Sequence, residues 1–532
     1  MGLRVFFAIM RAGYLNRVRS YRFLVILVLC IVAGYVFVPA PGANYVTLGW
    51  GSSTAFYRGV YNSAWIGSMV ALLTGMFLAL FGFYVVNDAV KRDETTGVGQ
   101  VIATAPLGNP VYTLGNALGN FLVLGTMVVI VFLTALGMQL VRGEVLVVDF
   151  WALLAPFVVI VLPLMFLVAA VAVLFETVPS LSGGVGNMLY VVLWLFGVPI
   201  LSDAFDLFGN NMIISSMGAA GGIVYPGLHE VGFILGYSWG FPEGRTLETF
   251  TWSGIQWTFE ILQTRLLLMG VALGIALLAS LRFNRFDPSS ETGRPSVSPS
   301  IGIDVENHTP PATPLVDVEL QPLGEEAVSF GFGSMLLAEC GLMLREFPSI
   351  GSMGLLGAAA MIIAGVVLPE GLTKGVLLPV AWLVPVLYWS RLGTREARHG
   401  TKQLVFSSAG VLVRQFWAMW LTGVIISFAS GGGVMLSLGM SGDMAGLAAV
   451  IVGALFVPSL ALFMGVWTGS SKTFEFLYTL LWYIGPMNGV VPLDFIGVVP
   501  GSVEAGVWHW YLGATVILVG LAFIGRRLQV QN

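Results

Sequence analysis

The chain has 532 residues, of which 57% are hydrophobic and 10% charged, and its mean hydropathy is +0.88. Soluble domains carry about 25% charged residues, so this composition excludes a soluble globular fold and predicts a polytopic membrane protein. The net charge of −4 says little by itself, because the placement of lysine and arginine along the chain is what orients a membrane protein.

The N-terminal segment, residues 3–20, mixes arginine with Phe, Ile, Met, Leu and Val. This mixture is typical of an amphipathic helix in the membrane interface, and residues 331–347 have the same character. The alternative is that each segment merely extends the span that follows it. We expect residue 23 onward to be a retained helix and not a cleaved signal, because many further apolar runs follow.

Apolar runs of roughly 17–25 residues are long enough to cross a bilayer. The sequence predicts six spans in the first half, at 23–39, 64–86, 112–138, 151–175, 185–201 and 263–281. It predicts six more in the second half, at 352–369, 375–389, 412–435, 446–467, 474–492 and 508–525. We therefore expect an all-α protein with about 12 transmembrane helices.

Lysine and arginine gather in the N-terminal segment, the loops after the second and eighth spans, the central linker and the C-terminus. If the spans alternate, these segments share one side, which the positive-inside rule assigns to the cytoplasm together with both termini. An even number of spans per half predicts two parallel repeats, residues 1–283 and 331–532. Residues 284–330, rich in Pro, Ser, Glu and Asp, are expected to be a flexible cytoplasmic linker.

A polar segment occurs once in each half, at residues 92–104 and 395–407. Aligned without a gap, the copies share an arginine, an acid, a glycine, a glutamine, two aliphatic residues and a hydroxyl residue in the same order. Solvated turns with helix caps remain the simpler interpretation. The repetition favours a second one, in which both loops act against something outside the membrane.

The repeat extends to the fifth and eleventh spans, where residues 189–197 resemble residues 477–485. Beyond them, the sequence Asp-x-x-Gly at 206–209 matches the same pattern at 494–497. Glycine and proline interrupt both spans near their outer ends, which indicates either an outer gate or simple kinks. The candidate gate residues are Gly197, Pro199, Gly485 and Pro486. The external loop 202–262 contains three tryptophans and is expected to form a small cap or to pack at the membrane interface.

Several kinds of chemistry find no support in the sequence. The centres of the predicted spans carry no ionisable residue, although such groups usually mark ion or proton paths. No G-x-x-x-x-G-K-[ST] motif occurs, and the four histidines have no metal-ligand spacing. Cys30 and Cys340 are expected to be packing residues. We therefore expect no catalytic, cofactor or metal site in this chain, and no enzyme activity of its own.

The basic interfacial helix, the six spans per half and the polar loop after the second span resemble the permease subunit of type-2 ABC exporters. In that family the loop forms a coupling helix that docks into a groove on a separate cytoplasmic ATPase. In the first loop the matching positions are Glu94, Gly97, Gln100, Val101, Ile102, Thr104 and Pro106. In the second loop they are Glu396, Gly400, Thr401, Gln403, Leu404, Val405 and Ser407. Arg92 and Arg395, which open the two loops, are expected to take part in the coupling as well. The second loop has Ala409 where Pro106 stands in the first, so the two loops are not equivalent.

A twelve-span chain looks like both units of such a permease fused in one polypeptide. The resemblance implies two copies of an ATPase subunit, with ATP and Mg²⁺ on that partner, and no need for a homodimer. It implies a plasma membrane location in a prokaryote and no nucleic-acid partner. The implied substrate is an apolar or amphipathic molecule such as a lipid, peptide or drug, moved out of the cytoplasm or inner leaflet. We expect the second, fifth, eighth and eleventh spans to flank its path.

Two other functions remain open. A secondary carrier of the major facilitator type also has two parallel six-span halves. It would need a short G-x-x-x-D-[RK]-x-G-[RK] loop after the second span and charged residues at the midplane, and the sequence has neither. A non-transport membrane scaffold is the third possibility.

Overall fold

The computed structural model describes residues 2–283, 331–345 and 360–531, apart from gaps at 42, 44, 52–54, 88, 106, 180, 198–204, 227, 229–231, 240–245, 366, 369 and 408–410. The predicted linker 284–330 and most of the span predicted at 352–369 lie outside the described residues. Helices make up 77% of the structure, which confirms the coarse prediction of a helical membrane protein.

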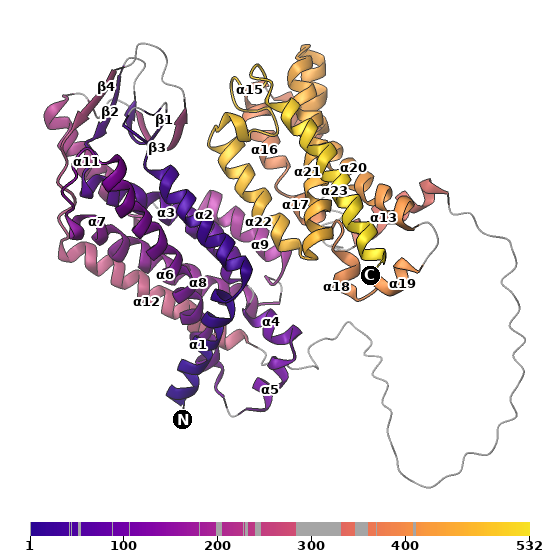
Figure 1. The fold of residues 1–532 in the computed structure, drawn as a ribbon, viewed down its shortest axis with the longest axis horizontal. Helices are drawn as coiled ribbons and strands as arrows, with labels where there is room; N and C mark the ends of the chain where they lie inside the picture. The colour runs from indigo at the N-terminus through magenta and orange to yellow at the C-terminus, as the bar shows by residue number, and fades with distance from the viewer. Residues whose placement is uncertain are drawn as a thin grey trace, which may run out of the picture.

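The described part of the first half contains helices and π-helical segments in this order: α1 (Gly2–Val18), α2 (Tyr21–Phe37), α3 (Ser63–Val86), α4 (Ala89–Thr95), α5 (Val98–Thr104), α6 (Asn109–Arg142), α7 (Phe150–Pro156), η1 (Phe157–Val161), α8 (Leu162–Thr177), α9 (Gly184–Val192), η2 (Leu193–Gly197), α11 (Asn210–Val224) and α12 (Phe259–Arg282). Figure 1 shows them as one bundle, coloured indigo to magenta.

The second half forms a bundle beside the first, coloured orange to yellow in Figure 1. Its described elements are α13 (Phe332–Arg345), α15 (Glu370–Leu372), η5 (Thr373–Leu377), α16 (Leu378–Ala381), α17 (Val386–Trp389), α18 (Arg395–His399), α19 (Lys402–Phe406), α20 (Val411–Ser441), α21 (Met444–Thr468), α22 (Ser471–Trp482), the π-helical η6 (Tyr483–Met487), the 3₁₀ turn η7 (Val491–Leu493) and α23 (Val507–Gln531).

Within the described residues, seven helices are long and apolar enough to cross a membrane, or eight if α1 and α2 count as one bent pair. The seven coincide with predicted spans, and their bounds are Ser63–Glu94, Asn109–Arg142, Phe150–Thr177, Phe259–Arg282, Leu412–Ser441, Met444–Thr468 and Val507–Gln531. The axes of α1 and α2 differ by 75°, so α1 is not a straight extension of the first span.

The other predicted spans are shorter or broken. The span predicted at 185–201 is α9 followed by the π-helical η2, and the span at 474–492 is α22 followed by the π-helical η6. The span predicted at 375–389 is divided among η5, α16 and α17. Two of these three interruptions lie next to proline, which cannot donate a helical hydrogen bond: Pro379 is at the start of α16, and Pro486 lies inside η6.

Burial separates interior helices from peripheral ones. In the most apolar stretch of the α3 span 78% of the residues are buried, against 17% for α12 and for α23. Glycines allow the interior helices to approach closely, since a side chain at Gly67 would meet the backbone of Leu153 and one at Gly465 the backbone of Leu392. The core is therefore built around α3 in the first half, with α12 and α23 at the outside.

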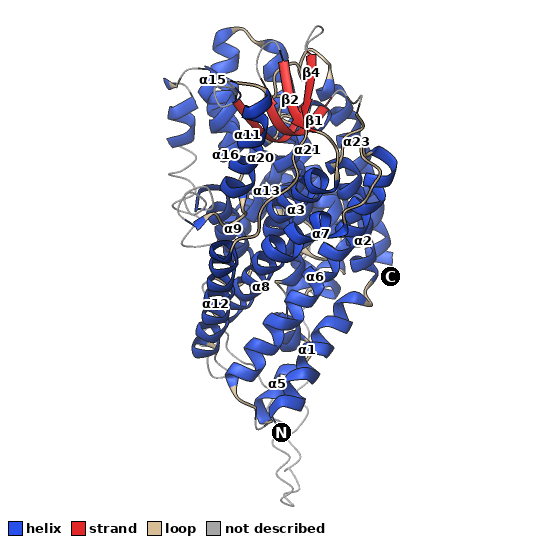
Figure 2. Ribbon diagram, turned by 90° about the vertical axis from the view of Figure 1, so that its left-hand side faces the viewer, coloured by secondary structure: helices blue, strands red, loops and turns tan. Residues whose placement is uncertain are grey.

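A four-stranded sheet is the exception to the expected all-helical fold, and it lies at one end of the bundle (Figure 2). Its order is β3 (Gly232–Trp239), β1 (Tyr45–Gly51), β2 (Ala55–Gly59) and β4 (Thr246–Phe250). β1 pairs antiparallel with β2 and β3, and β2 pairs parallel with β4. The segment that carries β1 and β2 and the one that carries β3 and β4 are far apart in the sequence but form one small domain, against which α11 packs.

An ion pair between a buried arginine and a partly exposed glutamate ties the sheet to the helices. Arg58 on β2 is almost fully buried, and its guanidinium donates to both carboxylate oxygens of Glu144, at 2.8 and 2.9 Å. Glu144 also accepts from the backbone N–H of Tyr61. The hydrogen bonds from Arg58 outweigh partial burial and lower the pKa of Glu144. The loop after α6 is therefore fastened to the segment that carries β1 and β2.

The Asp-x-x-Gly pattern takes a similar form in both halves. Asp206 accepts two backbone N–H groups of α11, and Asp494 accepts three backbone N–H groups of the loop before α23. The glycines three residues on, Gly209 and Gly497, have φ of +76° and +78°. Glycine is favoured in this left-handed conformation, which explains why the pattern contains it at both places.

Candidate functional site

The first polar loop is a pair of short helices, α4 and α5, joined at Gly97, whose φ is +75°. Its inner side is anchored to the bundle, because the hydroxyl of Tyr112 on α6 donates to Asp93 at 2.7 Å. The Tyr112 ring stacks on Phe283, with 4.9 Å between ring centroids. Ile102 of α5 packs against the same aromatic pair. The loop is thus held against both α6 and the end of α12.

The second polar loop repeats this construction with α18 and α19, joined at Gly400, whose φ is +66°. Glu396 is 4% exposed and accepts from Arg526 of α23 at 2.6 Å and from Gln415 of α20 at 3.1 Å. Arg395 forms an ion pair with Glu339 of α13 at 2.9 Å. Like the first loop, the second is held by the last helix of its own half.

Electrostatics strengthen the anchor of the second loop. Burial by itself would raise the pKa of Glu396, but the charge and the hydrogen bond of Arg526 outweigh it, so this pKa lies below the ordinary glutamate value. Arg526 also lies over the ring of Phe406, 4.6 Å from its centroid, at the end of α19. A buried pair of this kind is costly to break, because the remaining charge would stay unsolvated.

The outer faces of the two loops match position by position. Val101 is 70% exposed and its counterpart Leu404 is 74% exposed, although both are aliphatic. The hydroxyl of Thr104 donates to the carbonyl of Val101 at 3.0 Å, and that of Ser407 to the carbonyl of Leu404 at 2.9 Å. Both loops lie toward the end of the molecule opposite the sheet (Figure 1). Each therefore exposes an aliphatic side chain at the matched position of a short helix, and the first loop exposes Val98 as well, at 46%.

The remaining predicted residues of the loops differ in exposure. Those with exposed side chains are Glu94, Gln100 and Gln403. Those with partly buried side chains are Arg92, Ile102, Thr401 and Val405. Pro106 lies outside the described residues.

Sequence reasoning missed the acid that anchors the first loop. The family pattern points to Glu94, whose side chain is exposed, whereas the structure places Asp93 against Tyr112. The gapless alignment of the two loops could have identified Asp93 as the anchor, because it pairs Asp93 with Glu396. These two acids, one in each loop, are the ones that face the bundle.

The two halves meet through buried polar groups at the loop-bearing end. Asn187 on α9 accepts from the amide of Asn87 and donates to Glu475 on α22, both at 2.7 Å. The ammonium group of Lys472 on α22 donates to the carbonyl of Asn87. Glu475 lies near the start of α22 and away from the centre of the predicted span, so the search for ionisable residues at span centres did not identify it.

Aromatic side chains join the halves further toward the sheet. The ring of Phe77 on α3 lies 5.6 Å from that of Tyr483, and the ring of Phe81 lies 5.6 Å from that of Phe476. Trp194 of η2 also contacts Tyr483, at 5.2 Å. Of the four spans expected to flank a path, the second and the eleventh are therefore in direct contact.

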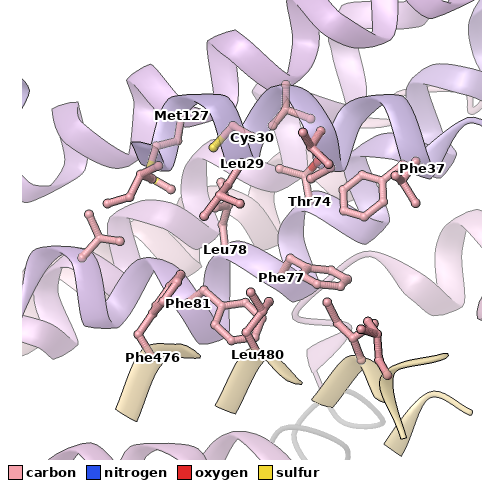
Figure 3. Close-up of a pocket in the computed structure, with 18 of the residues that line it drawn as sticks. Leu29, Cys30, Phe37, Thr74, Phe77, Leu78, Phe81, Met127, Phe476 and Leu480 are labelled. Atoms are coloured by element: carbon pink, nitrogen blue, oxygen red, sulfur yellow. The ribbon is translucent and has the colours of Figure 1, made fainter. Parts of the chain in front are cut away.

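A cavity of about 450 Å³ lies at this junction (Figure 3). Its walls come from α2, α3 and α6 of the first half and from α22, η6 and the following turn of the second. Representative lining residues are Cys30, Phe37, Phe77, Phe81, Phe476 and Leu480. Cys30, expected to be a packing residue, is buried and forms part of this wall, whereas Cys340 is partly buried.

The predicted outer gate residues lie at the π-helical ends of the broken spans. Gly197 is the last residue of η2, and Pro199 lies outside the described residues. Gly485 and Pro486 both lie in η6. A side chain at Gly485 would clash with the backbone carbonyl of Leu493, so this glycine lets η7 fold back onto η6. This close approach explains the glycine at position 485 by packing. The outer gate remains a prediction.

Among the residues that the structure describes, no group of three or more His, Cys, Asp and Glu side chains is placed to hold a metal ion. No family model, curated protein or solved structure matches this chain. Its function must therefore be argued from the geometry of its own residues.

Proposed function

We propose that this chain is the membrane-spanning permease of an ATP-binding-cassette exporter, with two six-span halves in one polypeptide. Separate ATPase subunits dock on the loops α4–α5 and α18–α19. They supply the energy for moving an apolar or amphipathic substrate out of the cytoplasm or the inner leaflet of a prokaryotic plasma membrane. The chain contributes the path and the docking surfaces, whereas ATP and Mg²⁺ bind to the partner.

The observation that carries this proposal is the matched pair of loops. Both consist of two short helices around a left-handed glycine, both hold an acid against the bundle, and both expose an aliphatic side chain at the matched position. An exposed aliphatic residue on a rigid, anchored turn suits a hydrophobic contact with another protein. Two similar docking loops on one chain suit a partner present in two copies.

The anchors also provide a route for force. Asp93 is held by Tyr112 of α6, and Glu396 by Arg526 of α23. A push on either loop by a partner would thus reach membrane-spanning helices directly. In the first half the route continues, because Asn87 at the end of α3 lies two residues before α4 and contacts the second half. ATP-driven closure of two ATPases would rock the halves about this junction.

The test is copurification of the detergent-solubilised full-length protein from its native host. We expect a stoichiometric ATP-hydrolysing subunit in about two copies per chain. The double variant Val101→Glu and Leu404→Glu should lose this subunit, since each charge would face a desolvated apolar contact. Glu504→Lys is the matched control, because it changes an exposed charge just before α23, at the end away from the loops.

Loss of the ATPase in the double variant, with retention in the control, would support the proposal. A protein that purifies alone and drives no ATP-dependent export in vesicles would contradict it, and would leave a secondary carrier or a scaffold as the better assignment.

A further inference from the structure

The cavity between the halves has an almost wholly apolar wall. Aliphatic and aromatic side chains from α2, α3, α6 and α22 surround it, and none of its lining residues is ionisable apart from the thiol of Cys30. Its volume of about 450 Å³ lies within the range of pockets that hold drug-sized molecules. A charged ligand would lose its hydration here without gaining a counter-ion, so the wall excludes one.

One hydroxyl interrupts this apolar wall. Thr74 lies at the middle of α3, is 1% exposed and lines the cavity, as Figure 3 shows. Its hydroxyl has no hydrogen-bond partner among the described residues. A buried hydroxyl without a partner is destabilising, and nearly all buried polar groups in proteins have one.

Other threonines within the long helices behave differently. The hydroxyls of Thr126, Thr134 and Thr422 donate to the backbone carbonyl one turn earlier, at 2.8 to 2.9 Å. This local hydrogen bond is the usual way for a helical threonine to be satisfied in an apolar setting. Thr74 does not make it, so its hydroxyl keeps an unused donor and acceptor in the wall of the cavity.

The outer wall of the cavity is a single helix, α2. Residues of α2 such as Leu29 and Val32 line the cavity and are also 40% and 49% exposed at the molecular surface. Other α2 residues, including Val28 and Tyr35, do not line the cavity and are 58% and 51% exposed. In a membrane this surface meets lipid, so an apolar molecule would reach the cavity sideways from the bilayer by a small displacement of α2.

From these features we infer that the cavity binds an uncharged, mostly apolar molecule that carries one hydrogen-bonding group, a hydroxyl or a carbonyl, and that Thr74 holds this group at mid-depth. Phe77 and Phe81 of α3 and Phe476 of α22 pack against the apolar body. Because the ligand would touch both halves, its binding would depend on their relative position. This ligand is a substrate only if the chain is the proposed exporter, so its role in transport rests on the proposed function. Its binding to the cavity requires no ATPase.

The test uses the purified full-length protein in lipid nanodiscs without any partner. The probe is a long-chain fatty alcohol that carries a diazirine, and the comparison probe is the alkane of the same length with the same diazirine. We expect saturable photolabelling of peptides from α3 and α22 by the alcohol and weaker labelling by the alkane. Thr74→Val should lower labelling by the alcohol roughly three- to tenfold, the loss expected for one hydrogen bond.

Two variants serve as controls. Thr74→Ser keeps the hydroxyl and should retain the labelling, and Thr134→Val makes the same chemical change at a threonine that is satisfied within its own helix. A second measurement leaves Thr74 unchanged. It uses the variant Cys340→Ser, in which Cys30 is the single cysteine. Its reaction with N-ethylmaleimide should be slowed by the alcohol and less by the alkane.

Equal labelling by the two probes, or labelling unchanged by Thr74→Val, would overturn the inference. Labelling confined to other helices would do so as well. These outcomes would not affect the proposed function, because the ATPase copurification is measured independently of any ligand.

Discussion

The side-chain amide of Asn187 on α9 donates to the carboxylate of Glu475 on α22 at 2.7 Å, and this hydrogen bond joins the two halves. Both residues are at most 3% exposed, so neither group has water as an alternative partner. Lys472, one turn earlier on α22, donates to the carbonyl of Asn87 just before the first loop. Contact between the halves is therefore linked to the position of that loop.

The first prediction concerns this contact. Glu475→Ala would remove the acceptor and leave the Asn187 amide unsatisfied, at a cost of about 1.5–3 kcal/mol for a hydrogen bond to a charged group. The halves should then separate more readily at the loop-bearing end. Spin labels at positions 101 and 404, in a background without other cysteines, should show a longer and broader distance distribution.

Glu475→Gln is the matched control, because its side-chain carbonyl can still accept from Asn187. Its distance distribution should stay close to that of the unmodified protein. An unchanged distribution in Glu475→Ala would contradict a role for this hydrogen bond in holding the halves together.

The second prediction concerns pH and the anchor of the second loop. The folded-state pKa of Glu396 is lowered, so its pairing with Arg526 stabilises the protein fully above the unfolded pKa of about 4.3 and progressively less as the pH falls through the folded value. Glu396→Gln should therefore unfold at a lower temperature than the unmodified protein at neutral pH. The difference should shrink as the pH falls below the unfolded pKa and through the lowered folded value.

Thermal unfolding in detergent over this pH range, followed by tryptophan fluorescence, gives the measurement. Arg526→Met should be more damaging than Glu396→Gln at neutral pH, since it leaves a buried carboxylate without its cation, at a cost of roughly 3–5 kcal/mol. A constant difference between Glu396→Gln and the unmodified protein at every pH would refute the electrostatic explanation.

The third prediction concerns the loop glycines. Gly97 and Gly400 have positive φ, and a Cβ at either position would meet no atom within 4 Å. Alanine would therefore cost about 1 kcal/mol through the backbone alone, without any clash. Asparagine tolerates this conformation better than alanine does.

We expect the double Ala variant to bind less of the copurifying ATPase than the double Asn variant, with unchanged helix content by circular dichroism. The ratio of ATPase to permease on a stained gel measures the effect. If alanine and asparagine gave the same ratio, the left-handed geometry would have no part in docking.

The fourth prediction concerns the sheet. Arg58→Ala would remove both hydrogen bonds to Glu144, and because Glu144 is partly exposed, we expect a loss of about 1.5–3 kcal/mol and not the full cost of a buried ion pair. Limited proteolysis should cut the segments that form the sheet faster, while the fragments of the long apolar helices persist. Glu144→Gln should have a smaller effect, since it keeps one acceptor for Arg58. Equal protease resistance in all three proteins would show that the sheet is held by other contacts.

Much of this architecture could be predicted from local sequence. Seven of the twelve predicted apolar runs correspond to the long helices, because a stretch of that length and composition must satisfy its backbone internally in lipid. Gly97 and Gly400 marked the turns of the two loops, since few other residues accept a positive φ. The equivalence of Val101 and Leu404 could also be predicted from the sequence. The two loops align without a gap, so equivalent residues take the same position on their short helices.

Other features depend on contacts between distant segments, and only the tertiary structure decided them. The choice of Asp93 over Glu94 as an anchor depends on where Tyr112 of α6 lies. The sheet requires residues 45–59 to meet residues 232–250, and each segment alone lacks enough apolar length to be recognised as a strand pair. The cavity and its unsatisfied Thr74 exist because α3 and α22 meet with a gap between them, and the packing of two halves is not encoded in the periodicity of either.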